Sequence, residues 1–200
     1  MIGNDIVDLS ISPIAKGLRL RRFLLKLFTA REIELIDKSK DTARTIWTLW
    51  SIKESVYKII VRKEKKIRYA PKSVECETLT TVDDHSHRSI VSYAGLYFSS
   101  SSMMTGECIH TIAVADEEIA ARVYSATFDV STRHNESSFL HNEVIKAISD
   151  SHSIADVPIK MQKDDLSIPH VFRGEDEVAL LSLSHHGRYG AYAYINLESH

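Results

Sequence analysis

Cysteine is scarce in this 200-residue sequence, and neither sign of charge dominates it. The two cysteines, Cys76 and Cys108, lie far apart with no Cys-x-x-Cys pair, so neither a disulfide framework nor a zinc ribbon is indicated. Lysine and arginine total 25 and aspartate and glutamate 27, which gives a formal net charge of −2. Without a general positive field we expect no nucleic-acid partner, and any anion site must be local.

Long hydrophobic runs are also missing. The longest stretch without charge, residues 89–106, contains six serines and two glycines, and it indicates strands and turns rather than a membrane helix. At the N-terminus, Asp5 and Asp8 stand where a signal peptide would carry basic residues. We therefore expect a protein of the reducing cytoplasm that is neither exported nor placed in a membrane.

The remaining composition is that of a globular protein, with 44% hydrophobic and 26% charged residues. The length suits one compact body or two half-sized lobes. Thr29 and Glu32 have the spacing of a capping box, which predicts the start of a helix. Apolar spacing predicts further helices over residues 14–28, 41–61, 117–124 and 136–149, and strands over 2–9, 74–81, 90–99, 108–115, 159–163, 171–172, 180–184 and 191–197. Each half then combines helix with antiparallel sheet, which predicts the α+β class.

Two carboxylates and a lysine are the first candidates for chemistry. Glu54 and Lys58 share one face of the helix predicted over 41–61. They form either an ordinary surface pair or, because that helix is apolar nearly all round, charges that need a facing charge, metal or phosphate. Asp5 shares a strand face with Val7 and Leu9, and there it either caps a turn or acts as a ligand. Together, Asp5 and Glu54 form the oxygen set that Mg²⁺ uses with water and substrate phosphate.

The second candidate is the segment Ser182-Leu-Ser184-His185-His186-Gly187-Arg188. We interpret it as the end of a strand followed by a polar turn. Its histidines are either simply solvated or, with Ser184, donors to phosphate oxygens. Its spacing matches neither a nucleophile elbow nor a metal box.

Three segments together resemble the 4′-phosphopantetheinyl transferase superfamily. Residues 3–7 are similar to its Gly-x-Asp-Ile-(Val/Glu) motif, residues 50–58 to its Trp-x-x-Lys-Glu-(Ser/Ala)-x-x-Lys motif, and Ser184-His185 to its Ser-His motif. The stretch from Arg21 to Glu32 also resembles the short holo-acyl-carrier-protein synthases, whose arginines meet an acidic carrier helix. These matches run from the first residues nearly to the last.

The resemblance implies a fold. Residues 74–115 look like the end of the longer, surfactin-synthetase-activating type, and residues 159–188 look like its adenine-side half. The implied protein is a pseudo-dimer of two similar lobes in swapped order, with the active site in the cleft between them. Residues 1–116 would form the metal-binding, catalytic lobe and residues 117–200 the coenzyme A nucleotide lobe. The length favours a monomer, with a trimer like that of the short enzymes as the alternative.

The resemblance also implies an activity: transfer of 4′-phosphopantetheine from coenzyme A to a serine hydroxyl of an apo acyl or peptidyl carrier protein, with Mg²⁺, releasing adenosine 3′,5′-bisphosphate. Asp5 and Glu54 would bind the metal, and Glu54 and Lys58 would be catalytic. Lys58, Ser184 and His185 would bind coenzyme A. The carrier would meet the basic residues Arg19, Arg22 and Lys26. Carriers of fatty-acid, polyketide or peptide synthesis all fit.

Two departures from the family pattern stand out. The Gly-Lys-Pro motif of the longer enzymes appears here as Ser167-Ile168-Pro169, which removes the lysine that would contact coenzyme A. Val7 replaces the glutamate found two residues after the metal aspartate in the longer type. Two other functions remain open: a non-catalytic module that binds coenzyme A or a carrier, and a Mg²⁺-dependent nucleotide phosphohydrolase.

Overall fold

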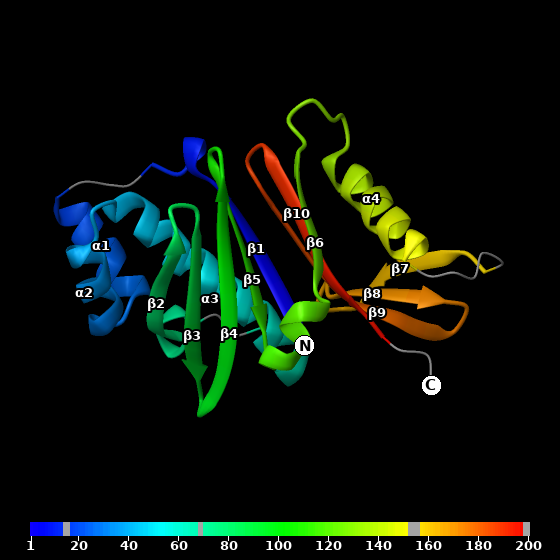
Figure 1. Cartoon of the computed structure of the whole chain (residues 1–200), viewed down its shortest axis with the longest axis horizontal. Coiled ribbons are helices and arrows are strands. Elements are labelled where there is room, and N and C mark those ends of the chain that lie inside the picture. Colours follow the sequence, from blue (N-terminus) through cyan, green and yellow to red (C-terminus); the bar gives the residue numbers. More distant parts are fainter. Residues whose placement is uncertain (14–16, 68–69, 152–156, 198–200) are drawn as a thin grey trace.

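The computed structural model describes residues 1–13, 17–67, 70–151 and 157–197. It contains two five-stranded antiparallel sheets, each accompanied by helix, and this confirms the predicted α+β class. The two sheets stand side by side, and the helices lie behind the first sheet and along the outer flanks of the molecule (Figure 1). No helix in the described part of the chain is long and apolar enough to cross a membrane.

The first sheet has the strand order β1-β5-β4-β3-β2. Its strands are β1 (Ile2–Asp8), β2 (Glu75–Asp83), β3 (Ser86–Tyr93), β4 (Leu96–Thr105) and β5 (Cys108–Val114). Between β1 and β2 lie the 3₁₀ turn η1 (Leu9–Ile11), the helices α1 (Leu18–Leu27), α2 (Ala30–Lys38) and α3 (Thr42–Glu64), and the turn η2 (Pro71–Ser73). The helix α3 packs on the sheet through a fully buried apolar row that includes Ile46, Leu49, Ile52, Val56 and Ile59.

The second sheet has the strand order β6-β10-β9-β8-β7. Its strands are β6 (Tyr124–Asp129), β7 (Ile159–Lys163), β8 (Pro169–Arg173), β9 (Asp176–His186) and β10 (Tyr189–Asn196). The helix α4 (Glu136–Asp150) lies on it and contributes Val144 and Ile148 to a second core, and the 3₁₀ segment η3 (Glu117–Arg122) joins the two parts.

The two parts repeat one topology: a strand, then helix, then four strands, with the first strand pairing to the last. The pairing also repeats in register. Ile6 pairs with His110 in the first sheet and Thr127 with Ala191 in the second. Likewise Ser102 pairs with Thr111, and Leu183 with Tyr192. This correspondence agrees with the predicted pseudo-dimer. The assignment of separate roles to residues 1–116 and 117–200 stays a prediction.

Several predicted elements need correction. Residues 90–99, predicted as one strand, form a hairpin that turns at Ala94 and Gly95, whose φ angles are 49° and 80°. Residues 99–106, which separate the strands predicted over 90–99 and 108–115, belong mostly to β4, where the buried hydroxyls of Ser100 and Ser102 bond to those of Ser89 and Thr111. Strand β6 was not predicted. The helix predicted from residue 14 begins at Leu18, and residues 14–16 lie outside the described part.

Candidate functional site

Strand β1 lies between the two halves of the molecule. It pairs with β5 on one edge, packs against α3, and also packs against β9 and β10 of the second sheet. Six of its seven residues are therefore buried, whichever way they point. Gly3 allows the close approach, because a Cβ there would lie 2.0 Å from the Ser55 carbonyl oxygen of α3. The strand brings Asp5 to the junction of both sheets.

Asp5 faces α3, where Lys58 and Glu54 are its charged neighbours. Its Oδ1 lies 3.9 Å from Lys58 Nζ, and its side chain is 14% exposed. Burial raises the pKa of Asp5 to about 6; the positive charge of Lys58 opposes this shift and the negative charge of Glu54 adds to it. Its second oxygen, Oδ2, is buried without a hydrogen-bond partner. The structure thus brings Asp5 and Lys58 within 3.9 Å of each other and Glu54 near enough to affect the pKa of Asp5, while the roles assigned to the three residues stay predictions.

Lys58 also connects the two halves. Its Nζ donates to the Asn4 carbonyl at 2.6 Å and to the Leu183 carbonyl of β9 at 3.0 Å. One turn later, Arg62 donates to the Leu181 carbonyl at 2.6 Å. The carbonyls of Leu181 and Leu183 need such partners because β9 extends beyond Leu180, its last residue paired to β8. Burial lowers the pKa of Lys58, and Asp5 and Glu54 oppose the shift.

Ser184 and His185 both lie within β9 and point to opposite faces of the sheet. The strand was predicted to end at Ser184, so the placement of His185 in the following turn was wrong. Ser184 Oγ accepts a hydrogen bond from Asn4 Nδ2 at 3.0 Å, and Ser182 Oγ accepts one from the Asn4 backbone N–H at 2.9 Å. His185 Nε2 lies 2.6 Å from an oxygen of Glu136, the first residue of α4. Ser184 therefore joins the Asp5 side of the site through Asn4, while His185 faces α4.

A hollow of about 540 Å³ opens between the start of α4 and strand β9. Ser184 and His185 line it together with Ser138, His141 and Lys163. The side chains of Ser138, His141, His185 and Lys163 supply hydroxyl, imidazole and ammonium donors, the groups that bind phosphate, whereas the Ser184 hydroxyl is bonded to Asn4 on the other face of β9. Ile168, which occupies the place of the family lysine, is buried instead and lines a different hollow, next to Lys58.

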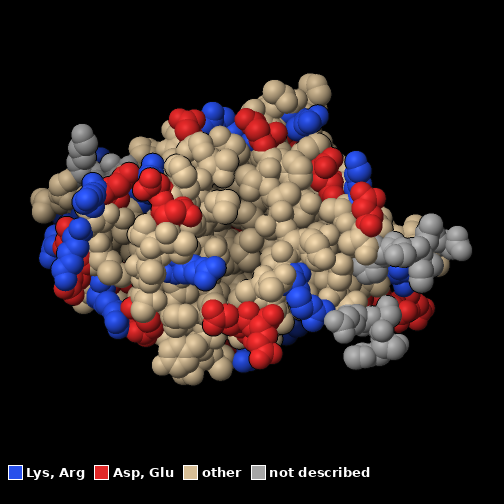
Figure 2. All heavy atoms as spheres, in the orientation of Figure 1, with Lys and Arg blue, Asp and Glu red and all other residues tan. Residues whose placement is uncertain are grey.

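The predicted carrier-binding residues lie apart from this centre. Arg19, Arg22 and Lys26 are all exposed on α1, and their spacing puts them on neighbouring turns of one side. Basic and acidic side chains alternate at this end of the molecule, where α1 and α2 lie (Figure 2). The structure therefore presents the three residues to solvent without joining them to Asp5.

Sequence reasoning missed the role of Lys53, the residue before Glu54. Its Nζ lies 2.7 Å from Glu32 Oε1, and both side chains are fully buried. Lys53 also donates to the carbonyls of Pro71 and Val74, while Glu32 accepts the Thr29 and Cys76 N–H groups. The confirmed capping box at Thr29 was the available signal, because its glutamate needs a partner once buried. This pair ties α2 to α3 and fixes the turn that carries Glu54.

The sequence model of a known protein family, the 4′-phosphopantetheinyl transferase superfamily, matches residues 1–155 of the chain. The chain belongs to this superfamily. The matched region holds the first sheet, α1 to α4 and β6, and so includes Asp5, Glu54 and Lys58. No curated protein matches the chain. Membership confirms the resemblance noted in the sequence and makes the protein a phosphopantetheinyl transferase in the general sense.

A divalent cation fits the carboxylates of this superfamily member. Asp5 Oδ2 is buried and has no hydrogen-bond partner, and Glu54 is close enough to raise the pKa of Asp5. The described residues contain no group of three or more His, Cys, Asp or Glu side chains able to hold a metal. Two carboxylates suffice for Mg²⁺, which takes its other ligands from water and phosphate.

Proposed function

We propose that this protein transfers 4′-phosphopantetheine from coenzyme A to a serine hydroxyl of an apo acyl or peptidyl carrier protein in a Mg²⁺-dependent reaction. Adenosine 3′,5′-bisphosphate is the second product. The observation that carries the proposal is the meeting, at β1, of Asp5 and Lys58 from the first half with Ser184 of β9 from the second. A substrate such as coenzyme A would place its pyrophosphate at Asp5 and Lys58 of the first half and its nucleotide end at the second half, so it needs both.

Phosphoryl transfer needs the charge on the transferring group to be neutralised. Asp5 and Glu54 would hold Mg²⁺, which when bound neutralises the pyrophosphate. Lys58 has three N–H donors, of which two are given to the carbonyls of Asn4 and Leu183. The third remains for a phosphate oxygen beside Asp5. Glu54 is also our candidate base toward the carrier serine hydroxyl.

The nucleotide end of coenzyme A would occupy the hollow between α4 and β9. The family motif implies that Ser184 and His185 both donate to its phosphate groups, His185 from inside the hollow and Ser184 from the β1 face of β9. Lys163, which lines the same hollow, supplies a positive charge that Ile168 does not. Arg19, Arg22 and Lys26 on α1 would receive the acidic helix of the carrier.

One experiment separates this proposal from its two alternatives. The protein is incubated with coenzyme A, Mg²⁺ and an apo carrier, and the carrier's mass and the loss of coenzyme A are both followed. We expect a mass gain of one phosphopantetheine group that stops when Mg²⁺ is chelated. Coenzyme A breakdown without carrier modification would show a phosphohydrolase, and binding without breakdown would show a non-catalytic module. Because acyl, polyketide and peptidyl carriers all fit, one of each is tested.

A further inference from the structure

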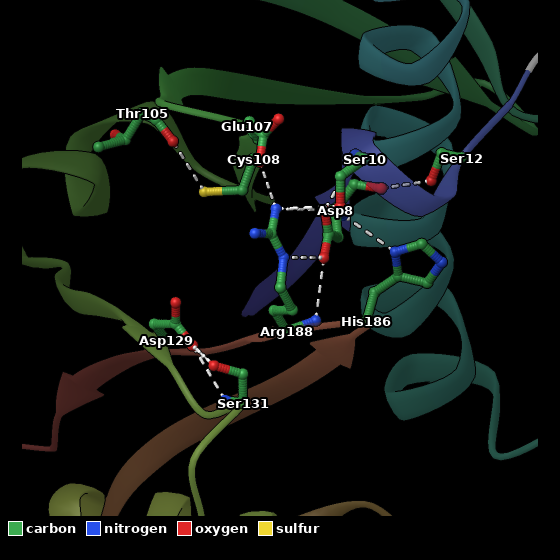
Figure 3. Close-up of polar contacts among 10 residues, drawn as sticks. All are labelled: Asp8, Ser10, Ser12, Thr105, Glu107, Cys108, Asp129, Ser131, His186 and Arg188. Carbon is green, nitrogen blue, oxygen red and sulfur yellow. Dashed lines mark hydrogen bonds and ion pairs between the residues drawn. The ribbon is translucent and has the colours of Figure 1, made fainter.

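Asp8, the last residue of β1, is a fully buried carboxylate that the proposed chemistry does not use. The backbone N–H of Arg188, its Nε and its second terminal nitrogen all donate to Asp8, at 3.0, 3.1 and 3.4 Å (Figure 3). Burial by itself would raise the pKa of Asp8, but the hydrogen bonds from Arg188 and Ser10 outweigh it and lower that pKa well below its usual value. The pair is charged and joins the two halves.

The contact is built for close approach. Gly187, between His186 and Arg188, has φ 57°, and a Cβ there would lie 2.6 Å from Asp8 Oδ2. The Asp8 backbone N–H donates to His186 Nδ1 at 2.9 Å, so both residues flanking Gly187 bind Asp8. The hairpin between β9 and β10 is therefore attached to the end of β1. On the hairpin the contact is centred on Gly187, two residues after His185, and on β1 it is made by Asp8, three residues after Asp5.

The internal repeat offers a built-in comparison. Asp129 ends β6 as Asp8 ends β1, and each aspartate accepts from the N–H and hydroxyl of the serine two residues on, Ser10 or Ser131. The following residues also correspond, because Leu9 donates to the Glu107 carbonyl and Val130 to the Arg188 carbonyl, both at 2.7 Å.

The two halves differ in the charged residue at the position of Arg188. The counterpart of Arg188 is Glu107, which cannot pair with Asp129; instead it lies 2.5 Å from Arg188 itself. Asp129 is exposed, whereas Asp8 is buried. At this position only the second half carries an arginine, and that arginine meets the end of β1, the strand that holds Asp5, which indicates a role beyond capping.

We propose that Asp8 and Arg188 are positioning residues for phosphopantetheinyl transfer: their pair keeps the Ser184–His185 segment of β9 aligned with the Asp5 segment of β1. This inference rests on the proposed function, in which coenzyme A contacts both segments at once. If the strands shift, the nucleotide and pyrophosphate ends of one molecule no longer reach both sets of contacts. A ligand that uses only the nucleotide side tolerates the shift.

The test uses the full chain with Arg188→Met, and with Asp129→Asn as the matched control. We expect Arg188→Met to raise the KM for coenzyme A about tenfold to a hundredfold. Its Kd for adenosine 3′,5′-bisphosphate, measured without Mg²⁺, and its KM for the carrier should stay near the wild-type values. Asp129→Asn should change none of these. The free energy of unfolding is measured for each variant.

Equal losses for coenzyme A and the bisphosphate, or lowered stability with an unchanged KM, would overturn the positioning role. If Arg188→Met does not fold, Arg188→Lys provides the same comparison, because it keeps the charge but loses the forked donor geometry. A wild-type protein that modifies no carrier would reject the proposed function instead. Direct titration with coenzyme A and Mg²⁺ would then still show whether Arg188 aligns the two segments.

Discussion

Glu54 is the residue whose replacement tests the metal assignment most directly. We expect Glu54→Gln to abolish carrier modification while leaving the thermal unfolding temperature nearly unchanged, because it removes one ligand charge and almost no volume. Its neighbour Lys53 makes the buried ion pair with Glu32 that joins α2 to α3, and this pair is kept in the variant. Transfer rate and unfolding are measured on the same preparation. Near wild-type activity of the variant at saturating Mg²⁺ would contradict the assignment.

His185 and His186 are adjacent in the sequence but have different partners. His185 lines the hollow beside α4, whereas His186 accepts the Asp8 N–H. His185→Ala should weaken coenzyme A binding by about tenfold to a hundredfold, the value of a charge-assisted hydrogen bond, with a smaller loss in kcat. His186→Ala should mainly lower stability. Equal effects of the two variants on the KM for coenzyme A would refute the nucleotide role of His185.

The buried side chain of His110 should make the stability of the protein fall at acidic pH. Burial, aided by the charge of Lys58, lowers its pKa to about 4, and its Nε2 lies 3.2 Å from Asn4 Nδ2. Below about pH 6.5 the unfolded chain binds a proton that the folded protein refuses, so stability falls as the pH drops toward 4. Between pH 7.5 and 5 the wild type should lose about 2 kcal/mol more than His110→Gln.

The comparison of the two proteins cancels the contribution of Asp5, which has the opposite sign. Denaturant titrations at the two pH values measure the difference. Parallel pH profiles for wild type and His110→Gln would show that His110 does not carry the effect.

Among the elements, α1 carries the predicted carrier contact. Arg22→Glu should raise the KM for the carrier roughly fivefold or more and leave the KM for coenzyme A unchanged, because charge reversal turns attraction into repulsion. Added salt should reduce the difference. Lys66→Glu, an exposed change just after α3, serves as the control. If both variants lose carrier affinity alike, the effect is one of net charge and not of α1.

The elements show which parts of the fold a sequence reveals. The helix α3 and strand β1 were predictable because both are rich in large apolar residues, α3 on nearly all sides and β1 on both faces, and Asp5, Glu54 and Lys58 lie on them. Strand β4 was not, because its inward positions Ser100 and Ser102 are polar and bond to other hydroxyls. Nor could spacing show that Lys53 pairs with Glu32, or that Arg188 meets Asp8, since these contacts depend on how distant elements pack.

At the scale of the whole molecule, the two sheets have the same strand topology but different charged residues at corresponding positions. By register, Ala126 of β6 corresponds to Asp5 of β1, because their partners in β10 and β5 correspond as well. The second half thus keeps the topology without the carboxylate. It contributes the hydroxyls of β9 and the hollow beside α4 instead, so the proposed site needs one copy of each half.

The strand order also determines which sheet can form first while the chain is being synthesised. Because β1 pairs only with β5, the first sheet can close once residue 114 has emerged, and by then Asp5 and Glu54 have both been synthesised. At the usual pace of translation, the β9–β10 hairpin follows roughly several seconds later. Until it arrives, Asp8 lacks the arginine that lies 180 residues further along the chain, and the apolar flank of β1 stays open. A nascent chain halted in that interval would expose the apolar surface of β1 that the second sheet later covers, and chaperones bind intermediates of this kind.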